Sequence, residues 1–193
     1  MVAVLGEDRS DAESLVELVR NISGRQNQTV FRKGFSGCAE LRRKALSHLR
    51  LFQQKGCTRF IVCHDADRSS PEHIRRLVRA ALGREFMDTC FIAVPVQELE
   101  AWLIADRCAI KRAIPSMDID EVRQPEMIDS PKEWLLEASR GRNSKPLYSP
   151  TTFNPKVAAF LDPNMVASKC PSFSVLKDFV QTECWSSLFS SVN

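Results

Sequence analysis

Short apolar runs alternate with amphipathic helical segments through the first half of the chain, and this alternation limits the possible folds more than any other feature. The apolar runs lie at residues 2–6, 28–31, 58–63 and 89–94. Strands and helices in this order favour parallel strands joined by right-handed crossovers. Strands covered on both faces are apolar throughout, as these are. The sequence therefore predicts an α/β fold with a central, mostly parallel four-stranded sheet flanked by helices.

The segments between these runs have apolar residues three or four positions apart, as one buried helix face requires. The first predicted helix begins with a capping box, Ser10-x-x-Glu13, and ends at Gly24. The third begins with Ser70 as N-cap and Pro71 at the first helical position. The apolar residues expected on the buried face are Leu15, Leu18, Val19 and Ile22 in the first helix, Leu41, Ala45, Leu49 and Phe52 in the second, and Ile74, Leu77, Val78 and Ala81 in the third.

The composition changes after residue 113, where prolines punctuate short helical pieces. We expect residues 1–113 to form the α/β domain, with its last helix at 98–106. Residues 114–193 are expected to form a helical appendage packed on that domain, so that both make one structural unit. Helices are predicted at 132–140 and after a Ser172 cap.

The seven cysteines predict neither disulfides nor a zinc site, because their number is odd and no pair has C-x-x-C spacing. Cys57, Cys63 and Cys90 lie in or beside apolar runs and are expected to be reduced core residues. Charges from Glu7 onward interrupt the apolar start, so no signal peptide is predicted. No apolar run approaches the ~20 residues of a membrane span. We expect a cytoplasmic protein without a membrane partner; the sequence leaves its oligomeric state open.

The net charge is only +3, but the basic residues are unevenly distributed. Residues 30–60 carry eight Lys and Arg against one acid, and residues 68–84 carry five Arg against one acid. Such a surface can bind phosphate groups, and the alternative is a set of solvated helix faces. The candidates for contact with nucleic acid, DNA or RNA, are Arg9, Arg32, Lys33, Arg42, Arg43 and Arg68.

Carboxylates follow three of the four predicted strands. Because the carboxyl ends of parallel strands meet at one edge of a sheet, ligands bind there and these side chains are expected to lie together. Clustered carboxylates repel one another unless a cation lies between them, and their oxygens suit Mg²⁺ or Mn²⁺. Two such ions would support phosphodiester hydrolysis. The residues are Glu7, Asp8 and Asp11 after the first strand, Asp65 and Asp67 after the third, and Glu98 and Glu100 after the fourth.

Each part of this pattern has a simpler interpretation. Asp65-Ala66-Asp67 could be a loop or cap, and Glu7 and Asp8 could be charges favoured at a helix N-terminus. Glu98 and Glu100 could be surface residues. His64 could be a base or a ligand, although a packed or supporting histidine is the more frequent case. The chain contains no P-loop, no G-x-G-x-x-G and no G-x-S-x-G motif, which disfavours the corresponding classes of enzyme.

Three segments resemble motifs of known families. LGEDRSD at residues 5–11 resembles the first TOPRIM motif, and HDAD at 64–67 resembles the second. PVQELEAWL at 95–103 is similar to the P-x-x-x-x-E-x-W-L signature of RloB-like proteins and of a family of small single-domain TOPRIM-like proteins. The C-terminal half resembles that second family in SPKEWL at 130–135, Tyr148, FLD at 160–162 and CPSF at 170–173. The chain departs from the first motif at Asp8, where TOPRIM proteins have glycine.

The resemblance implies a TOPRIM-like fold, shared with topoisomerases, primases and OLD-family nucleases. It implies that Glu7 acts as a general acid or base or as a metal ligand, and that Asp65 and Asp67 bind Mg²⁺. Glu100 would be a further acidic ligand, and Lys132 would stabilise phosphate charge. Asp8 and Asp11 are additional candidate ligands. Related proteins work beside an ATPase partner in anti-phage or abortive-infection systems.

The leading hypothesis is therefore a metal-dependent nuclease, and the second is a non-catalytic TOPRIM-like module that docks on an ATPase. A receiver-like or dehalogenase-like phosphotransfer domain is a third. The dehalogenase pattern is disfavoured because D-x-D follows the third strand rather than the first, and the receiver pattern because no fifth strand with a following lysine is predicted. Two structural expectations follow. The carboxylates of Glu7, Asp65, Asp67 and Glu100 should converge, and Trp102 should be buried between Leu99 and Leu103.

Overall fold

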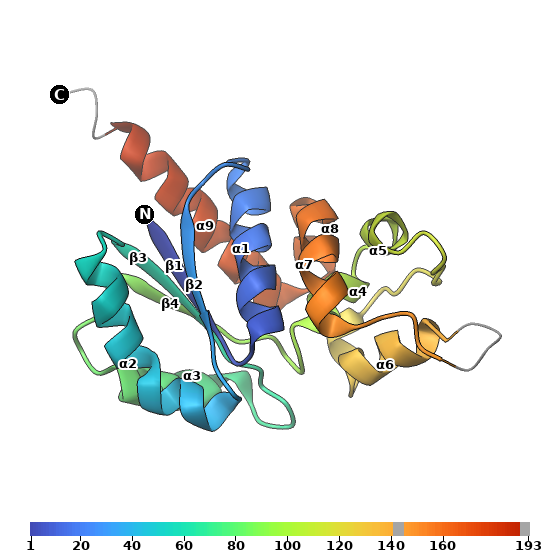
Figure 1. The fold of residues 1–193 in the computed structure, drawn as a ribbon, viewed down its shortest axis with the longest axis horizontal. Helices are drawn as coiled ribbons and strands as arrows, with labels where there is room; N and C mark the ends of the chain where they lie inside the picture. Colours follow the sequence, from blue (N-terminus) through green and yellow to red (C-terminus); the bar gives the residue numbers. More distant parts are fainter. Residues whose placement is uncertain (141–144, 190–193) are drawn as a thin grey trace.

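The computed structural model describes residues 1–140 and 145–189, the last part from 183 to 189 by its backbone alone. Four strands form one all-parallel sheet in the order β2-β1-β3-β4 (Figure 1). The strands are β1 (Val2–Gly6), β2 (Val30–Gly34), β3 (Arg59–Cys63) and β4 (Cys90–Ala93). The predicted α/β fold with a parallel four-stranded sheet is confirmed.

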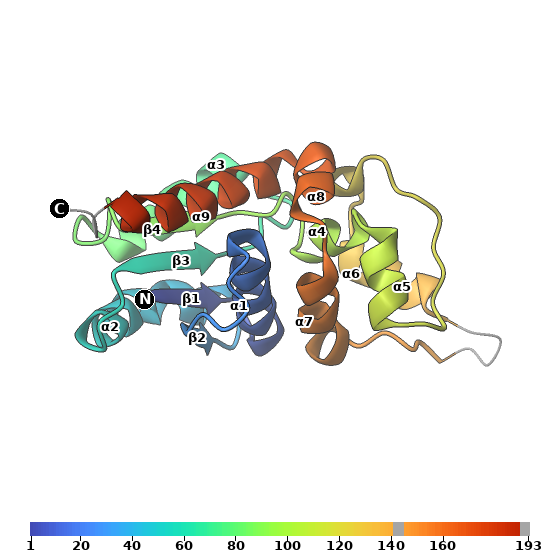
Figure 2. The same cartoon turned by 90° about the horizontal axis from the view of Figure 1, so that it is seen from above.

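Helices cover both faces of the sheet. Figures 1 and 2 show α2 and α3 on one face and α1 and α9 on the other, while α4 to α8 gather beyond the carboxyl ends of the strands. The helices are α1 (Arg9–Ser23), α2 (Cys38–Gln54), α3 (Pro71–Leu82), α4 (Glu100–Ile104), α5 (Arg107–Ala113), the 3₁₀ turn η1 (Pro125–Met127), α6 (Pro131–Ala138), α7 (Pro150–Phe160), α8 (Pro163–Lys169) and α9 (Pro171–Phe189).

Alternate residues of the strands enter two separate cores. Val4, Ile61 and Ala93 belong to a cluster that also contains buried residues of α1, α4, α5 and α7. Leu5 and Val62 belong to a second cluster with α2 and α3. Both faces of the sheet are thus dry, which explains why the strands are apolar throughout. The first cluster contains residues from both parts of the chain, before and after residue 113.

Helix α1 begins two residues earlier than the sequence predicted. Its N-cap is Asp8, whose Oδ1 accepts from the Asp11 backbone N–H at 2.9 Å, while Asp11 Oδ2 accepts from the Asp8 N–H at 3.2 Å. The predicted Ser10/Glu13 capping box is wrong, because this aspartate pair already satisfies the free N–H groups of the first turn. The end at Gly24 is confirmed, and its φ of 67° is the left-handed conformation that glycine adopts at low cost.

Strand β2 lies at residues 30–34 rather than at the predicted 28–31. It is an edge strand, so Arg32 and Lys33 can extend from it into solvent. Because of these charges, residues 30–34 do not form an apolar run in the sequence. The strand ends where Gly34 approaches the loop after β1. A Cβ at this position would lie 2.3 Å from the Asp8 backbone oxygen, so only glycine allows this contact.

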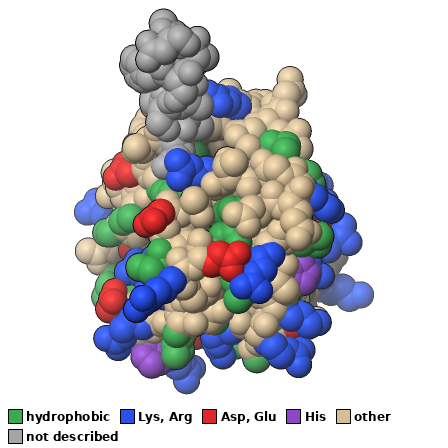
Figure 3. Space-filling model, turned by 90° about the vertical axis from the view of Figure 1, so that its left-hand side faces the viewer, with side chains coloured by type: hydrophobic (Ala, Val, Ile, Leu, Met, Phe, Trp, Pro, Cys, Tyr) green, Lys and Arg blue, Asp and Glu red, His purple; other side chains and the backbone are tan. Residues whose placement is uncertain are grey.

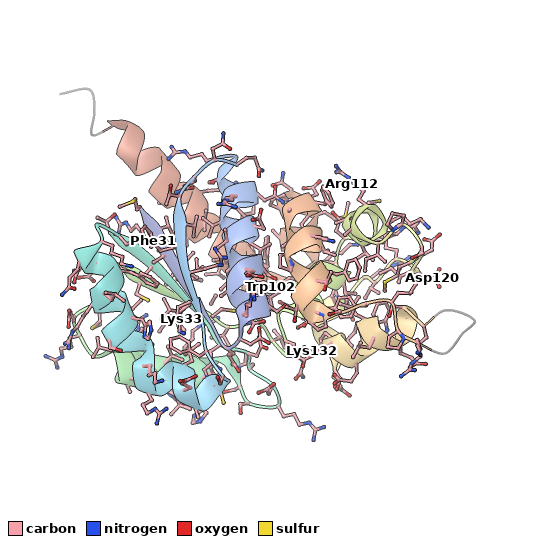
Figure 4. All side chains as sticks on the ribbon, in the orientation of Figure 1. Phe31, Lys33, Trp102, Arg112, Asp120 and Lys132 are labelled. Atoms are coloured by element: carbon pink, nitrogen blue, oxygen red, sulfur yellow. The ribbon has the colours of Figure 1, made fainter. Side chains whose placement is uncertain are left out.

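The predicted helix at 98–106 is shorter than expected, with α4 ending at Ile104 and α5 following at once. Trp102 is fully buried at the centre of the molecule, as Figure 4 shows, and Leu99 and Leu103 are buried with it. Its Nε1 donates to Ser172 Oγ at 2.8 Å. The expectation for Trp102 is confirmed. Ser172 lies in the first turn of α9, after Pro171, and so does not precede the helix as predicted.

The C-terminal half is bound to the sheet domain mainly through α1 and α7. The side-chain amide of Asn21 on α1 donates to the backbone oxygens of Ala158 and Leu161, at 3.2 and 2.6 Å. Cys57, Cys63 and Cys90 are buried free thiols, as predicted, and the side chain of Cys184 lies outside the described residues. None of the helices in the described part of the chain is long and apolar enough to cross a membrane.

A buried acidic cluster beyond the carboxyl ends of the strands

The order of the strands creates a switch point between β1 and β3. The chain leaves β1 for β2 on one side, and then returns past β1 to place β3 and β4 on the other. Crossover helices leave these two strands on opposite faces of the sheet, which opens a crevice beyond their carboxyl ends. Glu7 follows β1 and Asp65 follows β3 after one intervening residue. The topology therefore brings the two predicted acidic segments to the same place.

Glu7 joins the ends of these two strands. Its Oε1 accepts a hydrogen bond from the Asp65 backbone N–H at 2.9 Å and lies 2.9 Å from His64 Nδ1. His64 is buried, and its Nε2 lies 2.7 Å from Nη1 of Arg42 on α2. A guanidinium can only donate, so Nε2 accepts and the proton is on Nδ1.

The protonation of His64 is subject to opposing effects. Burial lowers its pKa and the hydrogen bond to Glu7 raises it, with a net rise. The contact with Arg42 nevertheless requires a neutral ring, because Nε2 can accept from the guanidinium only when it carries no proton. His64 is therefore a neutral, buried residue that donates a hydrogen bond to the Glu7 carboxylate.

Asp65 is the centre of a group of buried carboxylates. Its Oδ1 accepts from the Leu99 backbone N–H at 3.1 Å. Burial raises the pKa of Asp65 well above its ordinary value, and the nearby charges of Asp11, Glu100 and Glu7 raise it further. Burial and the charges of Asp8 and Glu100 likewise raise the pKa of Asp11 to about 8. We call Glu7, Asp11, Asp65 and Glu100 the acidic cluster.

Glu100 is the most deeply buried member, with 1% of its surface exposed. Its Oε1 accepts from the Asn154 side-chain amide at 3.0 Å and lies 3.8 Å from Lys132 Nζ. Its Oε2 is buried and has no hydrogen-bond partner among the described residues. Burial raises the pKa of Glu100, while Lys132 and Asn154 oppose the rise. A buried oxygen of this kind has lost its water without gaining a partner, which is costly.

Lys132 supplies positive charge to the cluster from the start of α6. Its backbone N–H donates to Glu98 Oε2 at 2.8 Å, and its Nζ lies 4.0 Å from Glu98 Oε1. Burial lowers the pKa of Lys132, but the charges of Glu100, Glu98, Asp65 and Asp11 outweigh burial and raise it. In Figure 4 the residue lies where the sheet meets the C-terminal helices. The single ammonium of Lys132 therefore offsets only part of the negative charge of the surrounding carboxylates.

Asp67 does not join the acidic cluster. Its residue is exposed, and its backbone has a φ of 48°, the only positive value among the described non-glycine residues. It lines a separate open hollow of about 410 Å³ together with Arg68, Glu98 and Asp129. The structure thus brings together three of the four expected carboxylates and adds Asp11. Asp8 remains at the edge, as the cap of α1.

The basic residues expected to contact nucleic acid are dispersed. Arg9 and Arg32 both pair with Glu13, at 2.9 and 3.6 Å. Lys33 lies over the ring of Phe35, and Arg43 is exposed on α2. Two of the six residues border the acidic residues. Arg42 contacts His64, and Arg68 lines the same hollow as Asp67.

The analysis of the sequence missed Asn154 and gave Tyr148 no functional role. Asn154 on α7 is fully buried, and it connects Glu100 to the hydroxyl of Tyr148, which donates to Asn154 Oδ1. Burial and the charge of Glu100 raise the pKa of Tyr148, so the phenol remains a donor. The sequence carried one signal: Asn154 shares a helix face with Val157 and Ala158, where a polar residue needs a buried partner.

The stability of the folded chain is expected to fall as the pH rises from about 4 to about 8. Folded Asp11 has a pKa of about 8 against an ordinary 3.8, so between these values the folded state holds a proton that the unfolded chain has lost. The stability that this proton contributes is fully present below pH 3.8 and is lost as the pH rises through about 8. Urea unfolding in the presence of EDTA at several pH values measures it. A midpoint that rises over this range would contradict the raised pKa.

The fold and the site define the class of the protein. It is an α/β protein with a Rossmann-like parallel sheet and with buried carboxylates beyond the ends of its strands. A family model described as "Domain of unknown function (DUF4276)" matches residues 6–181. The chain therefore belongs to the DUF4276 family. No curated protein and no solved structure matches the chain. The matched range contains the whole acidic cluster together with Lys132, Tyr148 and Asn154.

Proposed function

We propose that this protein is a Mg²⁺- or Mn²⁺-dependent nuclease that hydrolyses phosphodiester bonds of nucleic acid at the acidic cluster. The observation that carries the proposal is the buried, unpartnered Oε2 of Glu100 beside three further carboxylates and a single ammonium. Negative charge of this density is destabilising in the folded chain, and a divalent cation would offset it. A site retained at such a cost to stability is typical of function.

The donor atoms fit a hard divalent cation. All four members of the cluster offer carboxylate oxygens, which Mg²⁺ and Mn²⁺ prefer. The side chains as placed do not yet form a coordination shell: no group of three or more His, Cys, Asp or Glu within residues 1–140 and 145–182 is arranged to hold a metal ion. Lys132 provides the positive charge in this arrangement, 3.8 Å from Glu100. Ion binding would therefore require adjustment of these side chains.

Each residue has a role that follows from its position. Asp65, Asp11 and Glu100 would hold the ion, which when bound supplies an activated water and offsets charge on the phosphate. Glu7, whose Oε1 contacts His64 and the Asp65 N–H, would accept a proton. Lys132 would stabilise a phosphate oxygen. Arg42 and Arg68 border the site and would contact the nucleic acid backbone.

The resemblance to TOPRIM-like defence nucleases supports a role in an anti-phage or abortive-infection system with an ATPase partner, in the cytoplasm. A second candidate is a non-catalytic TOPRIM-like module that docks on such a partner. Two observations favour this alternative: Lys132 already provides positive charge to the cluster, and Asp67 lies apart from it. Metal binding separates the two candidates.

Titration of Mg²⁺ and Mn²⁺ into the purified chain by calorimetry tests the proposal. We expect saturable binding that an Asp65→Ala variant loses and an Asp67→Ala variant keeps, because only Asp65 belongs to the acidic cluster. Hydrolysis of labelled DNA and RNA, with and without Mg²⁺, then identifies the substrate. Absence of metal binding, with no metal-dependent hydrolysis, would transfer the assignment to the non-catalytic module.

A further inference from the structure

A second charged feature lies on α3, away from the acidic cluster. Ile74, Val78 and Leu82 of this helix are buried against the sheet. The opposite side of the helix carries arginines at positions three or four residues apart, so that they share one face. Basic side chains gather over the lower part of the molecule in Figure 3, with few acidic side chains between them.

These arginines line one hollow of about 540 Å³. Its walls include four guanidinium groups and a single carboxylate, that of Glu72, and its apolar part includes Met87, which is 51% exposed. The volume lies within the range of pockets that bind small molecules. Three of the arginines, Arg75, Arg76 and Arg79, belong to α3, and the fourth, Arg84, follows the helix.

The protein itself satisfies little of this positive charge. Arg75 approaches Glu72 at 3.8 Å, a long and exposed contact, and Arg79 donates to the backbone oxygen of Met87 at 3.2 Å. Arg76 and Arg84 form neither an ion pair nor a side-chain hydrogen bond with any described residue. Glu85, which follows Arg84 in the chain, is paired with Arg50 of α2 at 2.6 Å. Guanidinium groups held together in this way repel one another, and an anion would relieve the repulsion.

The chemistry of the hollow selects the anion. Guanidinium forks match phosphate oxygens in pairs, and their planes stack on flat rings. The exposed thioether of Met87 adds a polarisable contact for such a ring. We propose that this hollow binds a nucleotide through its phosphate, either as a free nucleotide or as one unit of a nucleic acid strand. None of its residues belongs to the acidic cluster, so the inference goes beyond the proposed function and does not depend on it.

Fluorescence anisotropy in EDTA tests the hollow without involving metal at the acidic cluster. The probes are a labelled adenosine triphosphate and a labelled 12-nucleotide single strand of DNA. The test variant is Arg76→Ala/Arg84→Ala, because these two side chains form no ion pair and no hydrogen bond with the described residues. The control is Arg107→Ala/Arg123→Ala, which removes the same charge from exposed positions of the C-terminal half.

We expect the test variant to bind about tenfold or more weakly than the parent chain, while the control stays within about twofold. Binding of the triphosphate identifies a free nucleotide as the ligand, and binding of the DNA strand alone identifies a strand. Absence of binding by the parent chain would overturn the proposal. An equal loss in both variants would overturn it too, because it would reveal only the effect of net charge.

Discussion

Replacing Asp65 with asparagine is expected to stabilise the metal-free protein at about pH 8 and, in the same molecule, to abolish metal binding. An asparagine keeps the oxygen that accepts from the Leu99 N–H and removes a charge that Asp11, Glu100 and Glu7 repel. We expect the free energy of unfolding to rise by about 1–2 kcal/mol, the size of gain that removing an unfavourable interaction commonly gives. Mg²⁺ affinity should fall by about 100-fold or more, since even outer partners of metal ligands contribute 10- to 100-fold.

Urea unfolding at about pH 8 in EDTA and calorimetric titration measure the two effects separately. Asp67→Asn is the matched control, because this aspartate is exposed and should change neither quantity appreciably. The stability gain should shrink toward about pH 4, where Asp65 in the folded parent chain already carries a proton. A variant that is less stable than the parent in EDTA at about pH 8 would show that the acidic cluster is not strained by its charges.

Replacing Asn154 with alanine is expected to lower the free energy of unfolding by about 3 kcal/mol or more. The change removes the partner of two buried groups, Glu100 Oε1 and the Tyr148 hydroxyl, and each unpartnered group costs about 1–3 kcal/mol. Of its two side-chain partners, Glu100 would then retain Lys132 at 3.8 Å. Because Asn154 also positions Glu100, metal affinity should fall although the variant keeps every carboxylate.

Asn164→Ala is the control for this prediction, because Asn164 is exposed on α8 and its hydrogen bond to Asp162 is donated by its backbone N–H. A double-mutant cycle with Tyr148→Phe tests the connection itself. The two changes should be non-additive, since each removes the same hydrogen bond. Additive effects would contradict a Tyr148–Asn154–Glu100 connection, and unchanged metal affinity in a folded Asn154→Ala protein would show that Asn154 does not position Glu100.

The fold could be predicted from the sequence because its determinants are local. Apolar runs such as 58–63 and helical stripes such as Leu41 to Phe52 report strand and helix directly, and their order restricts the sheet to parallel connections. The same reasoning placed Glu7 and Asp65 together, since each lies within two residues of the end of a strand and the carboxyl ends of these strands must meet. Errors arose where local signals compete. Two possible capping pairs lie within six residues at the start of α1, and backbone geometry selected Asp8 and Asp11.

The rest of the site depends on contacts between residues that are distant in the chain. Asn154 lies 54 residues from Glu100, and no local pattern connects α7 to α4. Asp67 belongs to the D-x-D, yet it is exposed and has a left-handed backbone, whereas Asp65 is buried. The sequence by itself therefore determined the α/β fold and the edge of the sheet where carboxylates collect. Only the tertiary structure decided which of them are buried together, because burial and mutual repulsion depend on how α4, α6 and α7 pack over that edge.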